Sequence, residues 1–142
     1  MHIIKLLGEN TSKRELFAAI LHQAGAEAAL PSVVEENESE IMSELLAREK
    51  MGDTSVAPGI ALAHARISEL KELFLLAAIL SEPMDWNSEN QVRLIFMLLI
   101  PGVLDAKGAK RSRRLMHFLA DDEICANMVR ADTPEELQRI LA

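Results

Sequence analysis

His64 is the residue whose type and setting most clearly offer chemistry. It lies in the segment PGIALAHARI, residues 58–67, where it follows an apolar run from Ile60 to Ala63. A histidine side chain titrates at about pH 6.5, so near pH 7 it offers a neutral ring nitrogen as a nucleophile. The glycine and proline before the run predict that His64 lies at a strand end, exposed at the surface. A purely structural histidine is the alternative.

A basic segment, KGAKRSRR at residues 107–114, is the second candidate. It holds five of the 15 Lys and Arg residues in a chain whose net charge is −7. A helix predicted to begin at residue 109 places Lys110 and Arg111 at its N-terminus, where cations oppose the helix dipole. Such a position favours a bound anion. Lys110 and Arg111 are therefore candidate contacts for an anion or an acidic partner, with a solvated helix face as the alternative.

Other classes of function find little support in the sequence. Four histidines and one cysteine show no metal-ligand spacing, and no Gly-rich nucleotide motif occurs, so we expect no metal and no cofactor. The negative charge argues against nucleic-acid binding. The longest apolar runs, LFLLAAIL and LIFMLLI, have eight and seven residues, too few to cross a membrane. The single cysteine cannot form an internal disulfide, which favours a cytoplasmic protein.

Hydrophobic periodicity and capping residues predict the elements that must position these side chains. Helices are expected over residues 12–25, 35–51, 109–120 and 122–131 and from Thr133 onward, and strands over 60–65, 73–80 and 92–100. A turn-rich break over 52–59 and a polar loop over 81–91 separate some of them. The two long apolar runs suit strands that are covered on both faces. We predict an α/β fold, with a small mixed β-sheet flanked by helices, in a single domain spanning residues 1–142.

The segment LLAREKMGDTSVAPGIALAHARI, residues 45–67, resembles the phosphoryl-accepting segment of enzyme IIA of the bacterial phosphotransferase system. The similarity is to the mannitol/fructose type, which includes the nitrogen-regulatory IIA proteins. In that family a helix ending in L-x-R-E precedes a threonine-containing turn and a GIAxPH strand. The matching positions here are Arg48, Glu49, Thr54, Gly59–Ala61 and His64. The similarity extends to VRLIFMLLIP, LMHFLADDEICANMV and TPEELQRIL, and so to nearly the whole chain.

The resemblance implies a phosphohistidine carrier. His64 would accept a phosphoryl group from a carrier protein such as HPr, Arg48 would offer its guanidinium to the phosphoryl oxygens and Thr54 would donate its hydroxyl. Sugar-specific members pass the group to a IIB domain, whereas nitrogen-regulatory members use it as a signal.

This chain departs from the family pattern at two places. Ala63 stands where the family usually has proline, and no histidine stands near Ala109, where a second active-site histidine is usual. Lys110 and Arg111 could replace that histidine electrostatically. The missing histidine favours the regulatory role. A non-catalytic module that keeps the fold and binds a transporter or another regulated partner is the alternative function.

Overall fold

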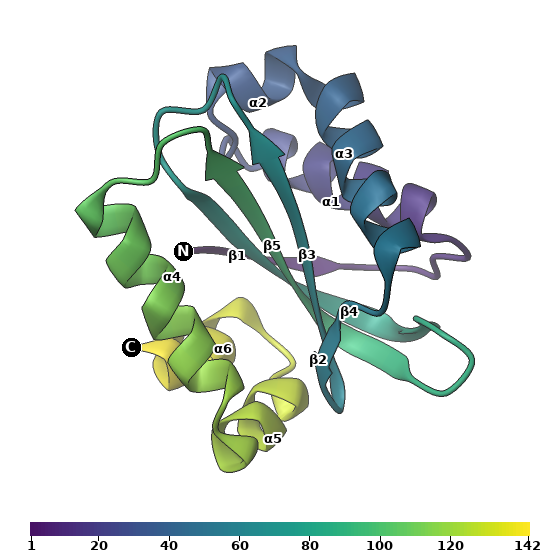
Figure 1. Cartoon of the computed structure of the whole chain (residues 1–142). Coiled ribbons are helices and arrows are strands. Elements are labelled where there is room, and N and C mark those ends of the chain that lie inside the picture. Colours follow the sequence, from purple (N-terminus) through teal and green to yellow (C-terminus); the bar gives the residue numbers. More distant parts are fainter.

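The computed structural model describes all 142 residues and contains five strands and six helices (Figure 1). The strands are β1 (His2–Leu6), β2 (Ser55–Ala57), β3 (Gly59–Ile67), β4 (Phe74–Asp85) and β5 (Gln91–Pro101). The helices are α1 (Lys13–Ala26), α2 (Ser32–Glu36), α3 (Glu38–Met51), α4 (Ala106–Leu119), α5 (Asp122–Arg130) and α6 (Pro134–Leu141). None of these helices has the length and apolar character that a membrane crossing requires.

The strands form one mixed sheet in the order β1-β4-β5-β3-β2. β1 runs parallel to β4, and β3 runs parallel to β5. The pairs β4–β5 and β3–β2 are antiparallel. The predicted mixed sheet between helices is confirmed.

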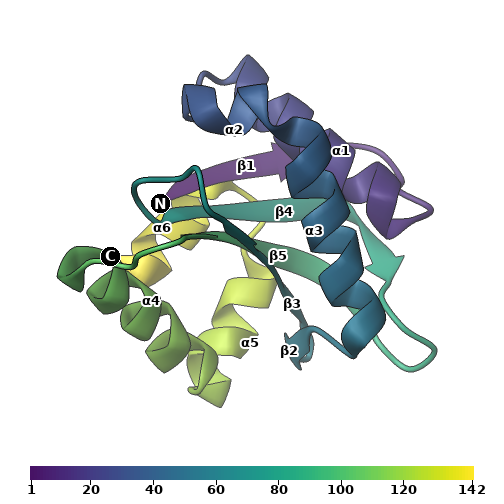
Figure 2. The same ribbon diagram turned by 45° about the horizontal axis from the view of Figure 1, so that its top comes forward.

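Helices cover both faces of this sheet. α1, α2 and α3 lie on one face, and α4, α5 and α6 lie on the other (Figures 1 and 2). The central strands β4 and β5 are therefore buried on both sides, which explains why their sequences are continuous apolar runs rather than alternating ones. Two hydrophobic cores result, one on each face of the sheet.

Several elements differ from the expectation from sequence. β1 was not predicted, because five residues carry too little periodicity. It places His2 in the sheet, where its ring forms a hydrogen bond with Glu27. α2 was not predicted either, and β2 lies inside the expected break over 52–59. β4 continues to Asp85, so the first part of the expected loop over 81–91 is strand.

The start of α4 also differs from the prediction. The helix begins at Ala106, because the Asp105 carboxylate accepts a hydrogen bond from the Gly108 amide at 2.7 Å and caps the first turn. Lys110 and Arg111 therefore lie in the second turn. The prediction that these two cations lie at the positive end of the helix dipole is wrong, since that effect is confined to the first turn.

Candidate functional site

His64 lies within β3, three residues before the strand ends at Ile67, so the predicted strand-end position is wrong. Ala61, Ala63 and Ala65 pack into the core beneath α1 and α3. Side chains alternate along a strand, so His64 points to the opposite face, which α4, α5 and α6 cover. The side chain is half-buried.

An uncovered sheet edge gives access to His64. β2 is short and pairs with β3 only at Ile60 and Ala61. Beyond that point the outer edge of β3 has no neighbouring strand. A side chain from α3, on the other face of the sheet, can therefore reach around this edge to the histidine.

Arg48 makes that contact. Its Nε lies 3.2 Å from Nε2 of His64, and its Nη1 donates to the carbonyl of Gly52 at 3.3 Å. Arg48 lies in the last turn of α3, where a cation is favoured by the helix dipole. The structure thus brings together the two residues that the sequence paired.

The hydrogen bond from Arg48 fits one tautomer of the neutral imidazole. An arginine Nε–H can only donate, so Nε2 of His64 is the unprotonated nitrogen and Nδ1 carries the hydrogen. Nδ1 is buried and has no hydrogen-bond partner. The lone pair that can act as a nucleophile is therefore on Nε2, at the side that faces the arginine.

Thr54 is buried, with 4% of its surface exposed, and its hydroxyl forms hydrogen bonds within the protein. Oγ1 lies 2.7 and 2.8 Å from the two carboxylate oxygens of Glu49, and it accepts a hydrogen bond from the indole nitrogen of Trp86 at 2.9 Å. The Lys13 ammonium is 2.7 Å from Glu49 Oε1 and 4.4 Å from the centre of the Trp86 ring. We call these four residues, Lys13, Glu49, Thr54 and Trp86, the Glu49 network.

The turn that contains Thr54 is further stabilised by Asp53. Its carboxylate accepts from the amide of Ser55 at 2.9 Å and from the Ser55 hydroxyl at 2.7 Å. These two hydrogen bonds, chiefly the one from the Ser55 backbone amide, hold the pKa of the Asp53 carboxyl below its usual value. The carboxylate therefore favours the folded turn when it is ionised.

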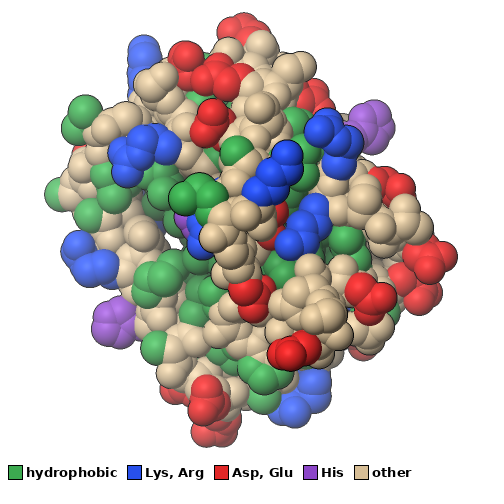
Figure 3. All heavy atoms as spheres, turned by 45° about the vertical axis from the view of Figure 1, so that its right-hand side comes forward, with side chains coloured by type: hydrophobic (Ala, Val, Ile, Leu, Met, Phe, Trp, Pro, Cys, Tyr) green, Lys and Arg blue, Asp and Glu red, His purple; other side chains and the backbone are tan.

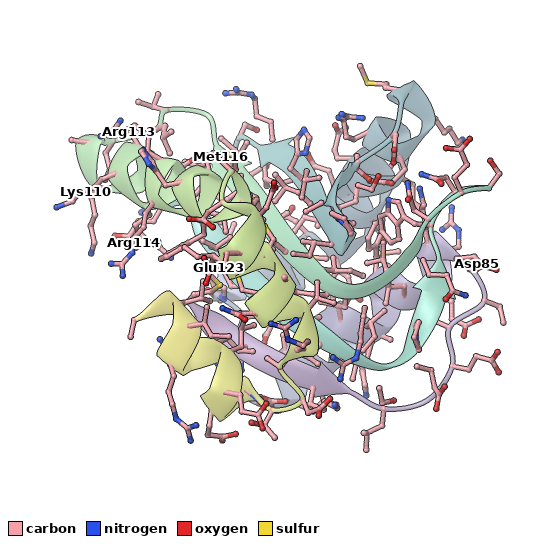
Figure 4. The ribbon with its side chains drawn as sticks, turned by 90° about the horizontal axis from the view of Figure 1, so that it is seen from below. Asp85, Lys110, Arg113, Arg114, Met116 and Glu123 are labelled. Atoms are coloured by element: carbon pink, nitrogen blue, oxygen red, sulfur yellow. The ribbon has the colours of Figure 1, made fainter.

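Lys110 and Arg111 do not contact His64. The Arg111 guanidinium donates to the carbonyl of Leu73, just before β4. Lys110 is exposed and projects from the outer side of α4, away from the sheet (Figure 4). A role for this pair in attracting an anion or a partner stays a prediction, and it would act at long range.

Hydrophobic side chains border the open side of the site. Met51 and Val56, in the segments next to Arg48 and Thr54, are 81% and 43% exposed. Figure 3 views the protein from near this edge and shows a hollow edged by hydrophobic side chains, with basic and histidine atoms inside it. No group of three or more His, Cys, Asp or Glu residues could hold a metal ion.

Sequence reasoning missed most of the Glu49 network. Glu49 and Thr54 stood in the quoted motif, but nothing in the sequence connected them with Trp86, whose indole nitrogen donates to the Thr54 hydroxyl. Lys13 carried a signal that was not used: a lysine in the first turn of a helix opposes the helix dipole. The acidic partner that explains it lies 36 residues away in the sequence.

Known proteins resemble this chain over nearly its full length. The family model "Phosphoenolpyruvate-dependent sugar phosphotransferase system, EIIA 2" matches residues 2–142. A nitrogen regulatory protein of Bradyrhizobium diazoefficiens is 30% identical over 142 residues, covering 99% of this chain and 88% of that protein. The PTS system 2-O-alpha-mannosyl-D-glycerate-specific EIIABC component of Escherichia coli is 31% identical over 133 residues, covering 89% of this chain but only 19% of that longer protein.

Solved structures show the same fold. Nitrogen regulatory protein IIA-Ntr from Neisseria meningitidis superposes with a TM-score of 0.72 at 26% identity, covering 98% of this chain and 92% of that one. IIA mannitol from Escherichia coli, at 16% identity, shares the fold with a TM-score of 0.69, covering 98% and 95%. The chain therefore belongs to the EIIA 2 family of the phosphoenolpyruvate-dependent sugar phosphotransferase system, and it is a IIA component of the phosphohistidine-carrier type.

Proposed function

We propose that residues 1–142 act as one cytoplasmic IIA-like domain that accepts a phosphoryl group on Nε2 of His64 from the phosphohistidine of a carrier protein such as HPr. The observation that carries this proposal is the 3.2 Å contact between Arg48 Nε and His64 Nε2 at an uncovered strand edge. It leaves Nε2 unprotonated and places a cation where the phosphoryl oxygens would arrive.

The chemistry follows from this geometry. The Nε2 lone pair forms the new N–P bond while the N–P bond of the donor breaks, and the electron pair of that bond stays on the donor imidazole. The hydrogen bond from Arg48 Nε to His64 Nε2 must break as the phosphoryl group approaches, because both use the same lone pair. Its forked guanidinium then stays within reach to bind the phosphoryl oxygens, which is the positioning and charge stabilisation that phosphoryl transfer needs.

The onward step is either transfer to a IIB partner or use of the phosphorylated state as a signal. Several relatives about 30% identical to this chain carry the name nitrogen regulatory protein. That similarity, together with the absence of a histidine near Ala109, favours the regulatory role.

Phosphorylation by purified components tests the proposal. Incubation with phosphoenolpyruvate, enzyme I and HPr should give an acid-labile phosphoramidate on the wild-type protein and none on His64→Ala. His22→Ala is the matched control, because His22 is an exposed histidine on α1, and it should be phosphorylated as the wild type is. Circular dichroism should show that both variants fold, since a half-buried side chain with one polar contact contributes little stability, about 1 kcal/mol.

Full phosphorylation of His64→Ala would contradict the assignment of the acceptor. No phosphorylation of the wild-type protein by components that phosphorylate another IIA protein would instead support the alternative function, a non-catalytic module that binds a transporter or another regulated partner. Arg48 would then hold His64 in an unreactive state.

A further inference from the structure

The Glu49 network contains two charges that oppose their own helices. Lys13 is the first residue of α1, where the helix dipole disfavours a cation, and Glu49 lies in the last turn of α3, where it disfavours an anion. The Glu49 side chain is only 5% exposed, although an isolated buried carboxylate is costly. Polar arrangements that work against local stability are expected at functional sites.

We propose that Glu49 is a positioning residue: it fixes the turn after α3 and thereby holds the Arg48 guanidinium against His64. This inference rests on the proposed function, because the reaction that it serves is phosphoryl transfer to His64. Glu49 itself touches neither the imidazole nor the incoming group.

A chain of contacts connects the carboxylate to the imidazole. Glu49 binds the Thr54 hydroxyl through both of its oxygens and so fixes the turn that begins at Gly52. The carbonyl of Gly52 accepts from Nη1 of Arg48, whose Nε donates to His64. The same turn is tied to β3, since the Thr54 carbonyl accepts from the amide of Leu62 at 3.0 Å. The turn therefore sets the position of the guanidinium relative to the strand that carries the histidine.

This arrangement changes the expected role of Thr54. A threonine hydroxyl has one proton to donate, and in the structure that proton goes to Glu49 while the oxygen accepts from Trp86. While the network is closed, Thr54 has no proton left for a phosphoryl oxygen. Thr54 then acts with Glu49 as a positioning residue and not as a direct donor to the transferred group.

Rapid-quench kinetics with phospho-HPr test the proposal. Glu49→Gln should lower the maximal rate of phosphoryl transfer by up to about 100-fold, the loss that a displacement of a catalytic group by about 1 Å can cause. The concentration of phospho-HPr at half-maximal rate should change little, since Glu49 is not on the surface. Glu44→Gln, at an exposed position of the same helix, removes the same charge and should leave both values unchanged.

A double-mutant cycle separates positioning from a merely structural role. In an Arg48→Ala background, Glu49→Gln should cause little further loss, because Glu49 acts through Arg48. Thr54→Val should likewise be non-additive with Glu49→Gln. Emission from Trp86, the only tryptophan, reports whether each variant keeps the fold around the network. If Glu49→Gln fails to fold, Thr54→Val in the two Arg48 backgrounds gives the same test.

Two outcomes would overturn the inference. One is a wild-type rate for Glu49→Gln, and for Thr54→Val where that variant replaces it. The other is an effect of similar size with and without Arg48. Both are distinct from failure of the proposed function, in which the wild-type protein itself takes up no phosphoryl group.

Discussion

At the scale of single residues, the proposed reaction depends on which nitrogen of His64 is free. Arg48 is the only side chain that bonds to the imidazole, and it selects Nε2 by donating to it. The basic side chain of Arg66 lies two residues further along the same face of β3, exposed and without an ion pair. Arg48 alone therefore orients the nucleophilic nitrogen of His64.

Asp53 gives a residue-scale prediction about pH. Its pKa is lower in the folded protein, chiefly because of the bonds from Ser55, so its stabilising effect is present above the unfolded value of about 3.9 and is lost as pH falls through the folded value. The difference in the free energy of unfolding between wild type and Asp53→Ala should therefore shrink as the pH falls below about 5. Urea denaturation at several pH values measures it. A difference that does not change with pH would contradict the assignment, since the other carboxylates are common to both proteins.

At the scale of elements, the start of β3 is fixed by one glycine. Gly59 has φ +80°, a conformation that L residues rarely adopt, and an added Cβ would lie 3.1 Å from Val129 Cγ1 at the end of α5. The strand that carries His64 therefore passes close to α5 at this point. The register of β3 against β5 also shifts between Gly59 and Ile60.

We predict that Gly59→Ala lowers the free energy of unfolding by at least about 1–2 kcal/mol, the cost of a left-handed conformation for an L residue. Gly25→Ala is the matched control, because Gly25 is helical and its added Cβ would meet Leu30 Cδ1 at 3.7 Å, an ordinary contact. That control should be neutral or stabilising by about 0.5–1 kcal/mol. Urea denaturation of both variants measures the difference, and equal stabilities would show that the strand start adapts to a side chain.

At the scale of the whole molecule, the two cores share one sheet. The core under α1 and α3 contains Trp86, and the core under α4, α5 and α6 contains Cys125. β4 and β5 contribute side chains to both cores. Unfolding of either core would therefore expose strands on which the other core also depends. Residues 1–142 are therefore expected to unfold as one cooperative unit.

Two probes test this cooperativity. Burial, and secondarily the neighbouring Asp122 and Asp121, raise the pKa of the Cys125 thiol, so it should resist alkylation in the folded protein. Cys125 labelling and Trp86 emission should give the same midpoint in urea. Separate midpoints would show that the two faces of the sheet unfold independently and would contradict a single domain.

The sequence alone determined the parts of the protein that depend on local patterns. Apolar runs identified β4 and β5, because strands buried on both faces need continuous hydrophobic side chains. Ser12 and Thr133 identified helix starts through their capping geometry. The spacing of Arg48 and His64 in a recognisable motif identified the central pair of the site.

Only the tertiary structure decided features that depend on distant pairing. β1 forms because it pairs with β4. Its five residues are too few for a hydrophobic periodicity that would predict a strand from the sequence. The face on which His64 lies follows from its alanine neighbours in β3, which pack into the core under α1 and α3. The open edge through which Arg48 reaches it follows from how short β2 is and where it pairs. The Glu49 network joins two charges that are each unfavourable in their own helix, and their mutual neutralisation appears only when α1 and α3 pack together.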